Sequence, residues 1–450
     1  MLRDDHGLTL STDSPEAVRA FDHTLAGYLK YRADTPQRLG ALLKLNPELA
    51  MGHVLKGYFM ILGFNQTLVG AARTSQSVAS ELAGAMNSRE RAHLAALTHW
   101  LEGDLERTLR IWEEIFTEHP HDVLAFRLHH FIAFWLGKPD LMQRAVEAVL
   151  PRWDKELPGY VTILACRAFA HEEVGSYTVG ESAGRAAIDL DTGDVWAAHA
   201  VAHVMEMQGR RSEGIEWLKR LEPYWVGANN LVHHLLWHRG LYHFERGEFA
   251  EVLALYDNGF RDLSSQRTLA QPDLYIDVQN AASMLYRLSL QGVDVGNRWE
   301  ELADKAEARI GDCLNPFTLP HWMMALAGAG RWDSAKDMLE AMRAVAASNS
   351  GTISPLVRDY ALPVCEAVLA NSQGHPESAV ALMIPALGGM YRLGGSHAQQ
   401  DVLEQMFLDA ALKAKHNEAA RQLLERVTGR HPLPPARRIG YQTAAKAVMQ

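Results

Sequence analysis

Residues 175–191 read GSYTVGESAGRAAIDLD, a glycine followed by an amphipathic helical pattern. Tyr177, Ala187 and Ile188 fall on one stripe of that helix, as expected of a helix that packs a single face against its neighbours. Gly175 follows an apolar run, where glycine can take the left-handed conformation that ends many helices. The stretch therefore predicts the turn and the second helix of a helical hairpin.

The same shape recurs along the chain. Its turn glycines are Gly103, Gly137, Gly175, Gly209 and Gly247, so the successive spacings are 34, 38, 34 and 38 residues. Thirty-four residues is the tetratricopeptide period, and four more add about one helical turn. The hairpins are clearest over residues 90–262. Weaker repeats cover 40–85, where one first helix is expected from Leu45 to Gly63, and 273–430.

This periodicity predicts an all-α fold, a tetratricopeptide-like α-solenoid over residues 1–450. We expect a right-handed superhelix of helix pairs, which can curl until it is nearly closed. Hydrophobic residues make up 48% of the chain and charged residues 22%, so it can bury a large core.

Composition narrows the class of partner and the compartment. The net charge is −10 and no basic stripe is present, which argues against nucleic acid. The sequence contains no run of 18 apolar residues, so it predicts no membrane span. The first residues lack the apolar segment of a secretory signal. Three widely spaced cysteines in apolar helical patterns are expected to be buried free thiols. A cytoplasmic location is the simplest interpretation.

Several stretches also resemble a known family. They are Trp153-Asp154, Leu157-Pro158-Gly159-Tyr160, Ala170 to Gly175, Asp194 to Arg210, His233 to His238, Leu255-Tyr256-Asp257 and Gly394 to Gln399. With them the chain resembles the tetratricopeptide repeat protein 38 family, bacterial members included, over about residues 10–440. The resemblance implies the helical repeat fold and no defined activity.

In tetratricopeptide superhelices the first helix of each pair lines the concave surface. Residues about 13, 10, 6 and 3 positions before the turn glycine then face inward. Before Gly209 these are Trp196, His199, His203 and Glu206, so two imidazoles and one carboxylate share a stripe.

The two neighbouring first helices add ionisable groups to the same region. The preceding repeat contributes Glu172 and Glu173, and the following repeat contributes His234, Trp237 and His238. We therefore assign catalytic roles to His199, His203, Glu206, Glu172 and Glu173. Binding roles are assigned to Trp196, His234, Trp237, His238, Tyr160 and Asp277.

The residue types limit the chemistry. Histidines at i and i+4 can ligate one divalent metal, with the carboxylate of Glu206 as a third ligand or as an orienting group. Without a metal, a histidine paired to a buried glutamate can act as a general base, and adjacent carboxylates raise each other's pKa. No zincin or di-iron spacing is present, so a metal is only one option.

Two functions stay open at this level, and the His, Glu and Trp side chains at the inward positions favour the first, since peptide-clamping grooves typically use Lys, Arg and Asn. One is a small-molecule site inside the superhelix, with acid–base or hydrolytic chemistry on a metabolite. The other is a non-enzymatic scaffold whose concave groove binds a peptide or a protein, as tetratricopeptide modules do. Homo-oligomers are compatible with either. A purely structural histidine network is a third interpretation, since buried histidines are usually hydrogen-bonded core residues.

Overall fold

The turn glycines have the backbone conformation that the hairpin pattern requires. Gly103, Gly137, Gly175, Gly209 and Gly247 all have positive φ, between 62° and 85°. A Cβ is strained in this region, which explains why glycine occupies each of the five turns. The predicted hairpin turns are confirmed.

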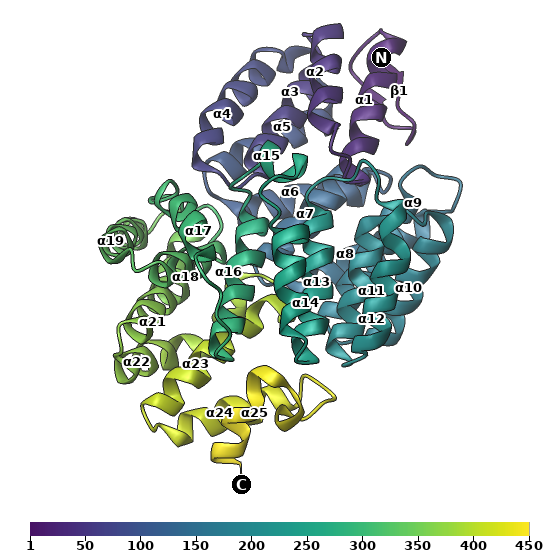
Figure 1. The fold of residues 1–450 in the computed structure, drawn as a ribbon. Coiled ribbons are helices and arrows are strands. Elements are labelled where there is room, and N and C mark those ends of the chain that lie inside the picture. Colours follow the sequence, from purple (N-terminus) through teal and green to yellow (C-terminus); the bar gives the residue numbers. More distant parts are fainter. Residues whose placement is uncertain (450) are drawn as a thin grey trace. The chain divides into compact units, whose positions relative to one another are not determined.

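A computed structural model describes residues 1–449, and almost all of its regular structure is helical (Figure 1). The chain forms two compact units. Unit 1 comprises residues 1–201, 223–231 and 350–352, and unit 2 comprises 202–222, 232–349 and 353–449. The boundary falls within helix α11 (Val195–Met207) and again near η3 (Glu222–Tyr224).

Unit 1 opens with two short antiparallel strands, β1 (Leu2–Arg3) and β2 (Thr9–Leu10). Its helices are α1 (Pro15–Leu29), α2 (Thr35–Leu45), α3 (Ala50–Ile61), α4 (Gln66–Glu81), η1 (Ala83–Ala85), α5 (Ser88–Leu101), α6 (Leu105–Glu118), α7 (Val123–Trp135), α8 (Pro139–Val149), η2 (Leu150–Arg152), α9 (Tyr160–Glu173) and α10 (Tyr177–Leu190). Consecutive helices pack as pairs: α3 with α4, α5 with α6, α7 with α8 and α9 with α10.

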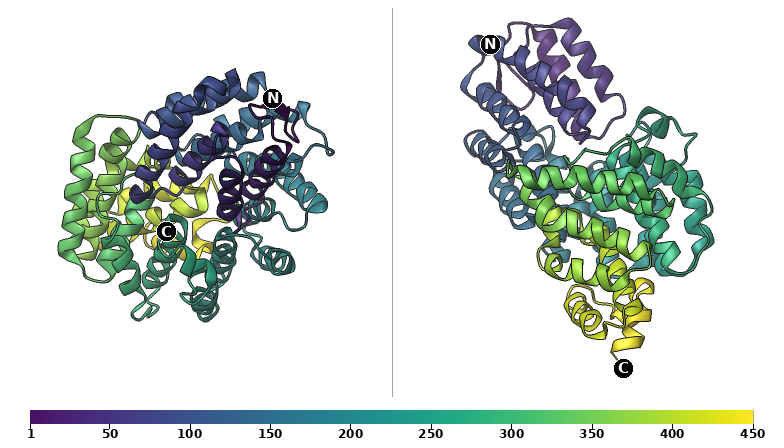
Figure 2. Two further views of the ribbon diagram at one scale, coloured as in Figure 1. Left: turned by 90° about the horizontal axis from the view of Figure 1, so that it is seen from above. Right: turned by 90° about the vertical axis from the view of Figure 1, so that its left-hand side faces the viewer.

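Unit 2 continues in the same manner. Its first helices are α12 (Arg211–Leu221), α13 (Leu231–Glu245), α14 (Phe249–Leu255), η4 (Tyr256–Phe260), α15 (Gln266–Ala270), α16 (Tyr275–Leu290), α17 (Arg298–Glu307), α18 (Thr318–Gly328) and α19 (Trp332–Ser348). They are followed by α20 (Ile353–Leu356), η5 (Val357–Ala361), α21 (Leu362–Ser372), α22 (Pro376–Leu387), η6 (Met390–Leu393), α23 (His397–Lys413), α24 (Asn417–Thr428), η7 (Pro435–Arg437) and α25 (Ile439–Val448). Helix α18 packs against α21, and α21 packs against α22, in the green part of the chain (Figure 2).

Small residues let helix α10 approach the neighbouring helices closely. Helix α10 buries Gly180, Ala183, Gly184 and Ala187. A Cβ added at Gly184 would lie 2.5 Å from Cγ2 of Val201, closer than packed carbon atoms come. The buried residues of the amphipathic pattern in residues 175–191 therefore form the packed face of α10.

One predicted helix is wrong. The expected helix from Leu45 to Gly63 is interrupted, because α2 ends at Leu45 and α3 begins only at Ala50. Pro47 disfavours helical backbone at the residue before it, and Asn46 is accordingly extended, with φ −137° and ψ 86°. The turn after α3 also differs, since the positive φ of 42° falls on Phe64 and Gly63 has none.

The three cysteines are free and buried, as predicted. Within residues 1–449, none of the helices combines the length and the apolar content that crossing a bilayer requires.

Candidate functional site

Three of the predicted histidines converge in unit 2. His203 lies on α11, while His234 and His238 lie one turn apart on α13. Their ring centroids are 4.3 Å apart for His203 and His238, 4.8 Å for His234 and His238, and 6.4 Å for His203 and His234. One ligand nitrogen of each ring lies within 4.8 Å of the others. We refer to these three residues as the histidine cluster.

Burial keeps the histidine cluster uncharged. The side chains of His203 and His238 have no solvent exposure, and His234 has almost none. Burial lowers the pKa of His203 and that of His238 well below the ordinary value, and it lowers the pKa of His234 to about 4. Neutral imidazole offers a lone pair, so these rings have the protonation state that a general base or a metal ligand needs.

Neighbouring side chains orient the histidine cluster. Nδ1 of His234 lies 2.8 Å from Oδ1 of Asn280, and Trp237 stacks on the His234 ring with centroids 5.1 Å apart. Asp277, predicted as a binding residue, has its Oδ2 3.0 Å from Nδ1 of His233. Asp277 therefore pairs with the residue next to the cluster.

Glu206 lies on α11 but borders a different feature of unit 2, a cavity of about 30 Å³. A cavity of this size holds one or two water molecules. Burial raises the pKa of Glu206 to about 8, with repulsion from Glu245 adding to the effect and Arg438 opposing it. Oε2 of Glu206 has no hydrogen-bond partner among the described residues.

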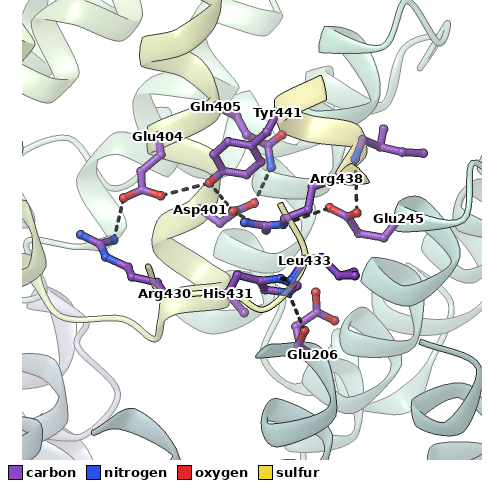
Figure 3. A network of polar contacts seen from close by, with 12 residues as sticks. Glu206, Glu245, Asp401, Glu404, Gln405, Arg430, His431, Leu433, Arg438 and Tyr441 are labelled. Carbon is purple, nitrogen blue, oxygen red and sulfur yellow. Dashed lines mark hydrogen bonds and ion pairs between the residues drawn. The ribbon is translucent and has the colours of Figure 1, made fainter. Parts of the chain in front are cut away.

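An ion-pair network surrounds this cavity (Figure 3). Nη2 of Arg438 lies 2.8 Å from Oδ1 of Asp401, and Nη1 of Arg430 lies 2.8 Å from Oε1 of Glu404. The Tyr441 hydroxyl lies 3.0 Å from Oε2 of Glu404 and also within hydrogen-bond distance of Asp401, so its one proton is shared between the two carboxylates. These carboxylates are held by two arginines of the segment between α24 and α25 and by Tyr441 of α25, which is typical of a structural network.

Trp196 and His199 lie on the part of α11 that belongs to unit 1. Their rings stack with centroids 4.7 Å apart, and Trp196 also stacks on Tyr31 at 5.7 Å. The guanidinium carbon of Arg127 lies 4.6 Å from the centre of the Trp196 ring, in a cation–π arrangement. Trp196 is therefore a packed wall residue.

Glu172 and Glu173 are buried together at the end of α9, in unit 1. Burial raises the pKa of Glu172 well above its ordinary value, and repulsion from Glu173 adds to it. Burial also raises the pKa of Glu173 to about 8. A hydrogen bond with Glu172 lowers the pKa of Glu173, so the raising effect expected of a neighbouring carboxylate is found for Glu172 and not for Glu173.

Tyr160 lies on a groove of about 340 Å³ in unit 1, which we call the Tyr160 groove. Helix α1 forms one side of it and residues 155–162 form another. The apolar lining residues are Ala26, Leu29, Leu157, Pro158 and Val161. A binding role for Tyr160 was predicted from the sequence, but this groove was not.

Acidic residues gather at the Tyr160 groove. Asp5, Asp22 and Asp194 line it, and one ligand-type atom each of Asp4, His6 and Asp22 lies within 4.8 Å of the others. Burial raises the pKa of Asp22 to about 7, with repulsion from Asp5 and Asp4 adding to it, and burial raises the pKa of Asp194 to about 6. Oδ1 of Asp22 and both ring nitrogens of His6 have no hydrogen-bond partner among residues 1–449.

Sequence reasoning missed this acidic group. Asp4, Asp5 and His6 stand in the first residues, and Asp22 lies on α1, all outside the clear repeats. The available signal was local, because an Asp-Asp-His triplet precedes the first helix. Nothing in the repeat period indicates that these residues meet the segment around Tyr160.

The fold follows from the helix pairs and turns of the chain itself. Helices pack in consecutive pairs, and the turns between them use left-handed glycines at spacings of 34 and 38 residues. The chain has a tetratricopeptide-type α-solenoid fold. No protein-family model matches it, so the resemblance to the tetratricopeptide repeat protein 38 family stays a prediction.

Two solved structures of other helical proteins are similar to this chain. Yeast Tom70 is 12% identical, with 96% of this chain and 86% of that chain covered and a TM-score of 0.39. Naa15, in a structure of Naa15/Naa10 bound to HypK-THB, is 12% identical, with 92% and 68% covered and a TM-score of 0.26. At these values neither similarity bears on function.

Proposed function

We propose that this chain is a non-enzymatic tetratricopeptide-type scaffold that binds a cationic segment of a partner protein in the Tyr160 groove. One observation carries the proposal: a groove lined in part by apolar residues also holds carboxylates that have too few cationic side chains near them. The raised pKa of Asp22 has repulsion from Asp5 and Asp4 among its causes. A lysine or arginine side chain placed there would relieve that repulsion.

The two lysines that line the groove each lie next to a carboxylate other than Asp22. Nζ of Lys30 lies 2.8 Å from Oδ2 of Asp191, and Nζ of Lys155 lies 3.9 Å from Oε1 of Glu156. Asp22 forms no ion pair with either lysine. The charge of the groove therefore favours a cationic ligand over an anionic one.

The size and lining of the groove limit the ligand to a short segment. A volume of about 340 Å³ is near the lower end of the range of volumes found for ligand-binding pockets. Leu29, Leu157 and Val161 offer apolar contact beside the carboxylates. We therefore expect one basic residue flanked by small or apolar residues to be the recognised unit.

Acid–base chemistry on a metabolite is the weaker alternative. In unit 2, Glu206 borders a cavity of about 30 Å³, which is too small for a metabolite. The carboxylates beside it are paired with arginines and Tyr441. A substrate would need both space and unpaired polar groups at the same place.

Fluorescence anisotropy with labelled hexapeptides tests the proposal. The peptides alternate alanine with lysine, and matched peptides carry glutamine or glutamate in place of lysine. We expect the lysine peptide to bind the full chain most tightly. Asp22→Asn should weaken it about tenfold, as expected for the loss of a charge-assisted contact. Tyr160→Ala should also weaken it.

Glu16→Gln is the matched control, because Glu16 is a solvent-exposed carboxylate on the same helix and pairs with Arg19. Equal affinity for the three peptides would overturn the proposal. So would a loss in Glu16→Gln as large as that in Asp22→Asn. Competition by millimolar Ca²⁺ or Zn²⁺, beyond that of NaCl at equal ionic strength, would assign the acidic group to a metal ion instead.

A further inference from the structure

We propose that His203, His234 and His238 form a binding site for a divalent transition metal inside unit 2. The three ligand nitrogens come from two helices, α11 and α13, and lie within 4.8 Å of one another. This site is independent of the peptide groove, since it uses other residues of another unit.

The geometry needs only a small adjustment to hold an ion. Zinc–nitrogen bonds of 2.0–2.1 Å in a tetrahedral site place the ligand nitrogens about 3.3 Å apart. The present separations are at most 4.8 Å, so the nitrogens would approach by at most about 1.5 Å. Changes in the χ angles of three imidazoles can supply such a shift.

One ring already has the supporting contact that metal-bound histidines usually show. The amide oxygen of Asn280 lies 2.8 Å from Nδ1 of His234, so Nδ1 carries the proton and Nε2 carries the lone pair. Stacking on Trp237 holds the ring plane. These contacts fix the tautomer and the direction of one ligand before any ion binds.

The ligand type selects the class of metal. Neutral imidazoles suit Zn²⁺, Ni²⁺, Co²⁺ and Cu²⁺, whereas Mg²⁺ and Ca²⁺ prefer oxygen ligands. Asp277, hydrogen-bonded to His233, supplies a buried carboxylate near His234. That negative charge would offset part of the charge of the ion.

Water is the candidate for a fourth ligand, since metal sites with three protein ligands keep a position open for it.

Metal content and Co²⁺ spectroscopy of the full chain test the site. We expect about one equivalent of Zn²⁺ or another transition metal by elemental analysis after purification. The protein refolded with Co²⁺ should show the intense visible bands of a tetrahedral ion. His238→Ala should lower the affinity for Co²⁺ at least tenfold and abolish those bands.

His243→Ala is the matched control, because His243 lies on the same helix and pairs with Glu248 at 2.6 Å, outside the cluster. It should keep the metal and the spectrum. His234→Gln, which keeps a polar side chain, is a second variant in case His238→Ala fails to fold, and it should also lose the metal. Absence of both stoichiometric metal and Co²⁺ bands in the wild type would overturn the proposal. Equal Co²⁺ affinity in the wild type and a folded cluster variant would do the same.

Discussion

Nη2 of Arg438 lies 2.8 Å from Oδ1 of Asp401, and both side chains are largely buried in unit 2. Arg438 stands just before α25, whereas Asp401 belongs to α23. The ion pair therefore holds α25, the last helix of the chain, against α23 of the same unit. Glu245 lies nearby, with its Oε1 3.9 Å from Nε of Arg438, so the arginine compensates two carboxylates.

Arg438→Ala should destabilise unit 2 by about 3 kcal/mol, because it leaves buried carboxylates without their counter-charge. Urea unfolding followed by tryptophan fluorescence measures the loss, and hydrogen exchange should show earlier opening of α25. Arg437→Ala is the control, since Arg437 is exposed, and it should change the free energy of unfolding by no more than about 0.5 kcal/mol. Similar effects of the two variants would contradict a structural role for the buried pair.

Gly184→Ala should destabilise unit 1 by about 1–2 kcal/mol. Its new Cβ would lie 2.5 Å from Cγ2 of the buried Val201, so α10 would have to shift. Gly70→Ala offers the opposite case, because Gly70 is exposed within α4 and a Cβ added there would meet no atom within 4 Å. It should stabilise the chain by about 0.5–1 kcal/mol through helix propensity. Thermal unfolding should show a lower melting temperature for Gly184→Ala and a higher one for Gly70→Ala.

Asp22 should make stability fall as pH rises from about 4 to 7. Its pKa is raised from 3.8 to about 7 in the folded chain, so the folded state holds a proton that the unfolded state releases in this window. Solvent in the groove screens the charge of Asp22 and so reduces the effect. We expect the free energy of unfolding to fall by about 2 kcal/mol across this pH range. Asp22→Asn should match the wild type near pH 4 and exceed its stability near pH 8. An unchanged difference between the two proteins across this range would refute the shift.

The same titration should govern peptide binding. Asp22 is protonated below pH 7 and charged above it, so affinity for the lysine hexapeptide should rise between pH 6 and pH 8. Anisotropy titrations at constant ionic strength measure this dependence. In Asp22→Asn the rise should become smaller. A rise of equal size in that variant would show that another group controls the binding.

Asp122 should produce the opposite pH dependence. Burial opposes its charge, yet His93 and Arg89 hold the pKa of Asp122 well below its usual range, with Oδ2 at 3.0 Å from Nε2 of His93 and 2.6 Å from Nη1 of Arg89. This stabilisation is present above the unfolded pKa of 3.8 and is lost as pH falls below it. Asp122→Asn should cost about 3 kcal/mol at pH 7, because Arg89 stays buried without its partner.

The control for that experiment is Asp140→Asn, an exposed carboxylate in the first turn of α8. It should leave the free energy of unfolding nearly unchanged at pH 7. The deficit of Asp122→Asn relative to the wild type should shrink in acid. A deficit that stays constant down to pH 3 would contradict the assignment of the depressed pKa to Asp122.

The repeat turns could be predicted from the sequence because they depend on local physics. A left-handed residue after an apolar helix favours glycine wherever it occurs, so Gly103 and its four counterparts marked the hairpins. The i, i+4 spacing of His234 and His238 likewise placed both rings on one face of α13. Their approach to His203 followed from the order of consecutive pairs.

Other features depended on contacts between distant segments. Glu206 shares the helical stripe of His203, yet its surroundings are set by Arg438 and His431 near the chain's end, more than two hundred residues away. Helical periodicity gives the direction of a side chain and says nothing about which later segment covers it. The small cavity at Glu206 was therefore beyond sequence reasoning.

The sequence by itself determined the helical class, the hairpin turns and the faces on which the histidines lie, since these follow from backbone sterics and a period of 3.6 residues. Tertiary structure alone decided that Asp4, His6 and Asp22 meet beside the Tyr160 groove, and that Asp401 is closed off by α25. Those meetings join segments separated by up to about 190 residues, and the burial and the charge of these side chains exist only once the chain has packed.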